Sequence, residues 1–198
     1  MKEKVILNRA FFLLLTMTAF ISVSLAGCDA FDPYGGGFKT YTDPNKKFQV
    51  EIPKKYDFKV SSTHEMIDRI SLELRQYEAL GYGDVREFSV HVFKGIYGHV
   101  KDRMSVDEFQ DQMAAGIAEG VFADKKGKLI SQDYVERAGV TTPTLKLKLK
   151  HHGKDYWGIL DVYVYGDDLF LYGVSGLSPD IGSDKDAVYF LESFTIPD

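Results

Sequence analysis

The residue with the most distinctive chemistry is Cys28, the only cysteine in a chain of 198 residues. A single thiol can act as a nucleophile, a metal ligand or an attachment point, but it cannot form a disulfide within the chain. Its position narrows these roles, because residues 10–25 just before it contain no charged side chain. The nine residues at the start carry three bases and one acid. A basic start followed by an apolar run is typical of a secretory signal peptide.

The apolar run contains 16 residues, fewer than the roughly 20 that a helix needs to cross a hydrocarbon core. Thr16, Thr18, Ser22 and Ser24 make the run more polar still. The sequence therefore favours a cleavable signal over a permanent membrane span.

The run ends in Leu25-Ala26-Gly27-Cys28, which resembles the lipobox of bacterial lipoprotein precursors. The resemblance implies that Leu25, Ala26 and Gly27 are recognised by the signal peptidase, and that the Cys28 sulfur is lipidated before residues 1–27 are removed. Acyl chains of the palmitate type would then anchor the protein to the cell membrane, facing the periplasm or the cell exterior. Two alternatives stay open: an ordinary secretory signal that precedes an unrelated cysteine, and an uncleaved anchor.

The residues after Cys28 concern membrane sorting and the link between the lipid and the folded domain. Asp29 resembles the aspartate that keeps lipoproteins on the inner membrane of enteric-type bacteria. Residues 28–39 include Pro33 and three consecutive glycines, so we expect a flexible tether. A coil of about ten residues has a root-mean-square span of only about 17 Å, which keeps the domain close to the bilayer.

Composition limits the partners. The chain has 29 acidic and 24 basic residues, a formal net charge of −5, and loss of residues 1–27 makes it more acidic. Nucleic acid is therefore not an expected partner, and lipid instead of charge must attach the protein to a membrane. The apolar fraction of 44% is that of a globular protein, and the length of residues 40–198 suits one folded domain.

Two motifs resemble catalytic signatures without completing them. The segment from His64 to Asp68 stops short of H-E-x-x-H, because an aspartate stands where the zinc site needs its second imidazole. Residues 173–176, Gly-Val-Ser-Gly, lack the G-x-S-x-G spacing of a nucleophile elbow. We expect neither segment to be catalytic.

Two further groups could bind metal. His151 and His152 are adjacent, so on a strand their side chains point apart. Asp180, Asp184 and Asp186 offer oxygen ligands, but Gly182 and Lys185 break the pattern of a calcium loop, and helix capping explains the acids better. We expect no metal site, no cofactor and no enzyme activity.

The elements that must position these residues follow from periodicity. Residues 48–52 alternate apolar and polar side chains and predict a strand that stops at Pro53. Residues 66–77 fit either a strand or a helix face; we favour a strand, paired with the alternating residues 88–92. Ser105 and Glu108 form a capping box for a helix over 105–121, and residues 144–175 read as a three-stranded meander. A short helix opened by Ser183 or Asp184 follows.

Several of these features resemble PsbP-like domains over about residues 40–196. They are the pattern Y-x-D-P-x-x-x-F-x-V-x-I-P from Tyr41 to Pro53, the S-x-x-E-F helix start at Ser105, and the late meander with a closing helix before Ser193-Phe194. The resemblance implies an α+β fold, with one antiparallel sheet flanked by helices in an α/β/α sandwich. It also implies a role as an assembly factor or binding subunit. Residues 61–83 depart from the compact pattern.

The segment Thr144 to His151 supplies the best interaction candidate. Leucines at 145, 147 and 149 alternate with Lys146, Lys148 and Lys150, so the lysines form a positive ladder on a negative protein. Two structural explanations compete with partner binding: the lysines could protect an edge strand, or meet acids on neighbouring strands, such as Asp161 and Asp168.

The sequence as a whole predicts a non-catalytic envelope lipoprotein that binds or assembles a protein partner. The alternatives are a hydrolase whose acids and His64, His91 or His99 meet only in three dimensions, and a module that binds a small ligand or calcium.

Overall fold

The computed structural model describes residues 37–67, 70–80, 85–123, 127–151 and 153–197. Its described strands are β1 Phe38–Thr42, β2 Gln49–Pro53, β3 Lys59–Ile67, β4 Ile70–Leu80, β5 Val85–Phe93, β6 Gly127–Arg137, β7 Val140–His151, β8 Lys154–Tyr165 and β9 Asp168–Gly176. Its described helices are α2 Val106–Ala123 and α3 Lys185–Glu192, with 3₁₀ turns η1 Tyr97–His99 and η2 Ile181–Ser183. None of the described helices has the length and apolarity needed to cross a membrane.

Seven strands form one sheet in the order β3-β4-β5-β9-β8-β7-β6, and all neighbours are antiparallel. The chain makes β3, β4 and β5 in sequence, crosses the sheet through η1 and α2, and returns through the meander β6 to β9. The meander ends with β9 beside β5, and this pairing joins the meander to β3, β4 and β5 in one sheet. The predicted α+β fold and the predicted meander are both confirmed.

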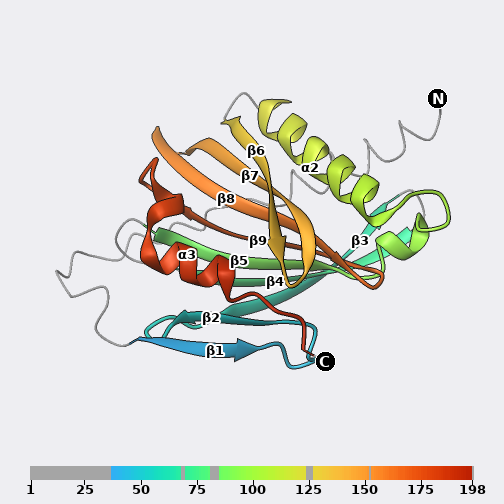
Figure 1. Cartoon of the computed structure of the whole chain (residues 1–198), viewed down its shortest axis with the longest axis horizontal. Coiled ribbons are helices and arrows are strands. Elements are labelled where there is room, and N and C mark those ends of the chain that lie inside the picture. The colour runs from blue at the N-terminus through green and yellow to red at the C-terminus, as the bar shows by residue number, and fades with distance from the viewer. Residues whose placement is uncertain (1–36, 68–69, 81–84, 124–126, 152, 198) are drawn as a thin grey trace.

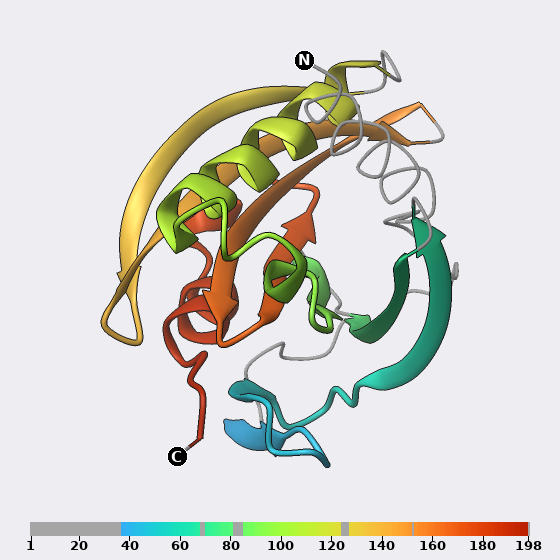
Figure 2. The ribbon, with the colours of Figure 1, turned by 90° about the vertical axis from the view of Figure 1, so that its right-hand side faces the viewer.

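The sheet has a different cover on each face. Figure 1 shows α2 on one side of the sheet and α3 with the β1–β2 hairpin on the other. Figure 2 shows the sheet curving around the side that carries α2. We call these sides the α2 face and the α3 face. The layers agree with the predicted sandwich of helices around a sheet.

The α2 face holds an aliphatic core. α2 contributes Phe109, Met113 and Ile117, and the sheet contributes leucines and valines from its central strands, among them Leu74, Leu145, Leu160, Val162 and Leu171. The predicted capping box starts this helix: the Ser105 backbone N–H donates to Glu108 Oε2 over 2.9 Å, and the Glu108 N–H donates to Ser105 Oγ over 3.3 Å. These bonds satisfy backbone donors that a helix start leaves open.

The α3 face holds an aromatic core. Phe48 of the segment before β2 contacts Tyr77, Phe170 and Phe194, and the rings of Tyr172 and Phe194 stack with centroids 4.0 Å apart. α3 begins at the predicted cap Asp184, whose carboxylate accepts the backbone N–H groups of residues 186 and 187. Such a core anchors the β1–β2 hairpin and α3 to the sheet, because each ring buries a large apolar area.

The turn within the Tyr41 to Pro53 pattern has a structural function. Asp43 is buried and accepts hydrogen bonds from the Tyr77 hydroxyl at 2.6 Å and from the backbone N–H groups of Asn45 and Lys47 at 3.0 and 3.1 Å. The aspartate therefore shapes the loop before β2 and fastens it to β4.

The strand interpretation of residues 66–77 is confirmed for the described residues 66–67 and 70–77, and β4 pairs with β5 as expected. The described part of residues 61–83, which depart from the compact pattern, belongs to the paired strands β3 and β4, and β3 is an edge strand. The other edge is formed by β6, a strand that was not expected from the sequence. The strand β1 begins at Phe38, inside the segment assigned to the tether.

Candidate functional site

The lysines predicted to contact a partner share one surface on the α3 face. Leu145 and Leu147 are buried in the α2-face core, so the alternating Lys146, Lys148 and Lys150 point to the opposite side. Lys128 of β6 lies directly across from Lys148, and it joins them. We call Lys128, Lys146, Lys148 and Lys150 the lysine face.

Only part of this positive charge is compensated among the described residues. Lys148 Nζ lies 2.6 Å from Asp155 Oδ2 and 5.0 Å from the centre of the Trp157 ring. The hydrogen bond from Lys148 lowers the pKa of Asp155, and the charge of Lys150 acts in the same direction. Like charges directly opposite each other on neighbouring strands are destabilising, so the Lys128–Lys148 pair leaves repulsion that an acidic surface would relieve.

Of the two structural explanations for the lysines, edge protection is wrong, and pairing with acids on neighbouring strands is confirmed for Lys148 alone, whose acid is Asp155 of β8. β7 pairs with both β6 and β8, so its lysines do not protect a sheet edge. Asp161 pairs with Arg137 at 2.9 Å and accepts from Thr144 at 2.6 Å, while Asp168 pairs with Lys47 at 2.9 Å. The acid that meets the ladder is Asp155, at the β7–β8 hairpin.

The other candidate residues fall into separate places. Leu25, Ala26, Gly27, Cys28 and Asp29 lie outside the described residues, as does His152, and the lipidation and sorting predictions rest on the sequence alone. His64 and His99 are exposed, on β3 and in η1. His64 pairs with Glu73, which faces away from the α2 side, whereas His91 is buried on the α2 face. The sheet thus separates His64 from His91.

The structure brings together polar side chains that the sequence analysis did not group. Glu87, Ser89 and His91 alternate with apolar residues along β5 and point to the α2 face. Glu78 of β4 lies opposite Ser89, and Ser175 of β9 lies opposite Glu87. We call these five residues the polar cluster. All but Glu78 are at least 94% buried.

Burial sets the protonation of this cluster. Desolvation, reinforced by the charge of Glu78, raises the pKa of Glu87 to about 7, although the Ser175 hydroxyl donates to its carboxylate. Desolvation lowers the pKa of His91 to about 4, so the imidazole is neutral at pH 7. The Nε2 atom of His91 lies 3.8 Å from Glu78 Oε1. Glu78 itself is half-buried, and desolvation raises its pKa.

Within the part of the chain that the structure describes, Ser89 lacks the hydrogen bond that activates a serine nucleophile. A nucleophilic serine needs a hydrogen bond to its base, and Ser89 Oγ has no hydrogen-bond partner among the described residues. Within the same ranges no three His, Cys, Asp or Glu side chains lie where they could hold a metal ion together. The cluster can accept hydrogen bonds and, when Glu87 is ionised, attract a cation.

A sequence signal for the cluster exists, although alternation alone hides it. The pattern of residues 87–92 predicts one buried and one solvated face, which suits a strand with a single cover. β5 lies inside the sheet between β4 and β9, so its polar side is buried too. Three polar residues at period two become informative once the strand is known to be central.

Two solved structures are similar to the fold of this chain to different degrees. The solution structure of cyanobacterial PsbP (CyanoP) from Synechocystis sp. PCC 6803 matches with a TM-score of 0.55 and 12% sequence identity, over 87% of this chain and 99% of that chain. The fold is PsbP-like. A crystal structure of PA94, a Pseudomonas aeruginosa protein of unknown function, gives a TM-score of 0.40 at 15% identity over 74% of this chain and 88% of that one. No family model and no curated protein matches the sequence.

The match to CyanoP confirms the PsbP-like fold expected from the residues between Tyr41 and Phe194. At 12% identity the likeness extends to the path of the chain and not to its activity. The lysine face and the polar cluster must therefore be interpreted from this chain's own side chains. They lie on opposite faces of the PsbP-like sheet.

Proposed function

We propose that this protein is a lipid-anchored, non-catalytic envelope lipoprotein whose PsbP-like domain binds an acidic surface of a protein partner at the membrane. The observation that carries the binding role is the lysine face, four bases on neighbouring strands of a chain with net charge −5. Opposite charges at an interface speed encounter and fix its orientation. Trp157 beside Lys148 adds an aromatic side chain of the kind enriched in interfaces.

The anchor supports this role by fixing where the partner is met. The lipobox-like Leu25 to Cys28 and the short tether place the domain within a few nanometres of the lipid surface. A net negative body is repelled by anionic headgroups. We therefore assign attachment to the lipid and the lysine face to the protein partner. Partner binding near the membrane follows from the anchor and the positive surface together.

Charge reversal in cells tests the proposal. The Lys146→Glu, Lys148→Glu and Lys150→Glu triple variant should lose a defined crosslinked partner that the unchanged chain captures by proximity crosslinking. A matched variant reverses the exposed Lys46, Lys54 and Lys185, which lie outside the lysine face, and should keep the partner. Equal capture by both variants, or capture of no defined partner, would remove the support for a binding role of this surface.

A further inference from the structure

The polar cluster on the α2 face contains a buried hydroxyl without a partner. Ser89 is 1% exposed, and its Oγ makes no hydrogen bond to any described group. Leaving such a group unsatisfied costs about 1–3 kcal/mol. Ser89 lies on β5 between Glu87 and His91 and directly opposite Glu78. Its position between two carboxyl groups indicates that the hydroxyl serves something other than the fold.

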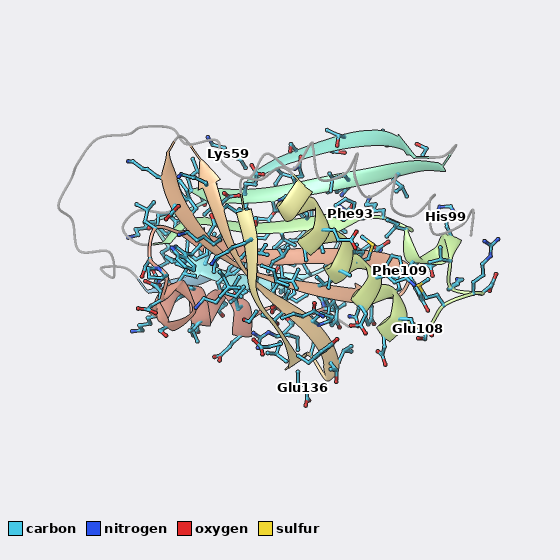
Figure 3. The ribbon with its side chains drawn as sticks, turned by 90° about the horizontal axis from the view of Figure 1, so that it is seen from above. Lys59, Phe93, His99, Glu108, Phe109 and Glu136 are labelled. Carbon is cyan, nitrogen blue, oxygen red and sulfur yellow. The ribbon has the colours of Figure 1, made fainter. Side chains whose placement is uncertain are left out.

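The cluster is made of hydrogen-bond acceptors and anions. Ionised Glu78 and Glu87 accept only, the hydroxyl of Ser89 can accept, and a neutral imidazole has one accepting nitrogen. The base opposite Glu78 on β3 is Lys59, which is exposed and makes no ion pair with it. Figure 3 shows Lys59 on this edge of the sheet, far from Glu136 on the other edge. The cluster thus has negative charge and no described base that neutralises it.

One position beside the cluster, Gly158, leaves room for a small group. Gly158 of β8 lies opposite Ser175 and adds no side chain. Gly173 of β9 lies opposite Ser89, but its position is filled, because a Cβ atom there would lie 2.3 Å from the backbone oxygen of Ile159 and 3.1 Å from Leu160 Cδ1. A Cβ atom built on Gly158 would meet a single atom within 4 Å, the backbone oxygen of Val174 at 3.4 Å. Leu160 and Leu171 of the apolar core border the same face. A small ligand with a charged head and an apolar tail has a matching environment.

We propose that the polar cluster binds the ammonium group of a small aliphatic amine, with Glu78 and Glu87 supplying the charge and Ser89 accepting a hydrogen bond. An anion is excluded by the two carboxylates. A metal ion lacks a set of three ligands among the described residues, whereas an ammonium needs only two or three acceptors. This site lies across the sheet from the lysine face and does not depend on the partner proposed for it.

Binding of an amine has a proton signature at this site. The raised pKa of Glu87, about 7, means that its carboxyl is about half protonated at pH 7. An ammonium beside it favours the ionised form, so the carboxyl releases its proton to the buffer while the amine keeps its own. The other groups facing Glu87 are Glu78, His91 and Ser175, and Lys59 and Tyr156 lie on the flanking strands. We expect about half a proton released per amine bound at pH 7.

Calorimetry of the purified full chain in detergent tests the proposal, with n-butylamine hydrochloride as the probe. We expect saturable binding at one site and weakening of roughly tenfold or more in Ser89→Ala and in Glu87→Gln, as for loss of a hydrogen bond to a charged group. Glu136→Gln makes the same chemical change at an exposed residue of β6 and should bind like the unchanged chain. Titration in two buffers of different ionisation enthalpy measures the released proton, which Glu87→Gln should abolish.

Several outcomes would overturn the site. Absence of saturable butylamine binding would do so, as would equal binding of 1-butanol, which has the same tail without the charge. Equal weakening in Glu136→Gln would indicate general attraction to an acidic protein. If calcium chloride displaces butylamine and Glu87→Gln no longer binds calcium, the site binds a metal ion and not an amine. Thermal unfolding of each variant checks that it is folded. If Glu87→Gln does not fold, butylamine binding by Ser89→Ala, which removes one atom, tests the site.

Discussion

At the scale of single residues, burial shifts the pKa values of Glu87 and His91 in opposite directions. Desolvation disfavours the charged form of each, which raises the pKa of the carboxyl from 4.5 to about 7 and lowers that of the imidazole from 6.5 to about 4. Between about pH 4.5 and 7 the folded Glu87 holds a proton that the unfolded chain has lost, so its contribution to stability falls as pH rises. Between about pH 4 and 6.5 unfolded His91 is protonated and folded His91 is not, so its contribution rises.

The two contributions nearly cancel in the unchanged protein, and single substitutions should separate them. As pH rises from 4.5 to 7, the free energy of unfolding of Glu87→Gln should increase by about 3 kcal/mol relative to that of the unchanged chain. As pH rises from 4 to 6.5, the free energy of unfolding of His91→Asn should decrease by about 3 kcal/mol relative to that of the unchanged chain. Urea unfolding followed by the fluorescence of Trp157, the only tryptophan, measures both. Stability curves for the two variants that run parallel with pH would show that neither group is buried as described.

At the scale of elements, the predictable parts are those fixed by local rules. Ser105 and Glu108 define the start of α2, Asp184 defines the start of α3, and the glycines at 153 and 166, both with positive φ, mark the turns of the meander. Each of these signals is complete within a few residues, so the sequence contains the whole cause. The same holds for the lysines of β7, whose common face follows from alternation.

The parts that escaped prediction depend on contacts between distant elements. Alternation identified β5 as a strand but not as a central one, and only its place between β4 and β9 buries Glu87 and Ser89. β6 has an exposed, polar sequence because it is an edge strand with a bulge at Ile130, which weakens its periodicity. Lys128 was missed for the same reason. Strand order is a property of the assembled sheet, so no local pattern encodes it.

Gly173 gives the element scale its own prediction. A Cβ atom at this position in β9 would lie 2.3 Å from the backbone oxygen of Ile159, which is too close for any atom pair without moving β8. Gly173→Ala should therefore lower the free energy of unfolding by about 1–3 kcal/mol, the range seen for overpacked cores. Gly158→Ala is the control, since its Cβ would meet one atom at 3.4 Å. Urea midpoints compare the two, and an equal loss in both would mean that β8 and β9 adapt freely.

At the scale of the whole molecule, the sheet separates two kinds of surface. The lysine face lies on the same side as α3 and the aromatic core, while the polar cluster lies on the side covered by α2. Because the central strands β5, β9 and β8 are shared by both sides, a change that moves one of them reaches both. A domain of this kind can present one side to a partner and keep the other for a small ligand.

The membrane anchor is the remaining prediction, and it concerns the chain outside the described residues. If the lipobox-like Leu25-Ala26-Gly27-Cys28 is processed as the resemblance implies, the mature protein begins at Cys28 and carries two or three acyl chains. Each buried methylene contributes about 0.8 kcal/mol, so chains of this number hold the protein firmly, whereas one chain binds only marginally. Mass spectrometry of the mature N-terminus and incorporation of an alkyne-labelled palmitate should both detect the lipid. Cys28→Ser should abolish label incorporation, while Ser24→Ala, a small change in the apolar run, should retain it. An unmodified Cys28 in the mature protein, or label that persists in Cys28→Ser, would show that the protein reaches its membrane in another way.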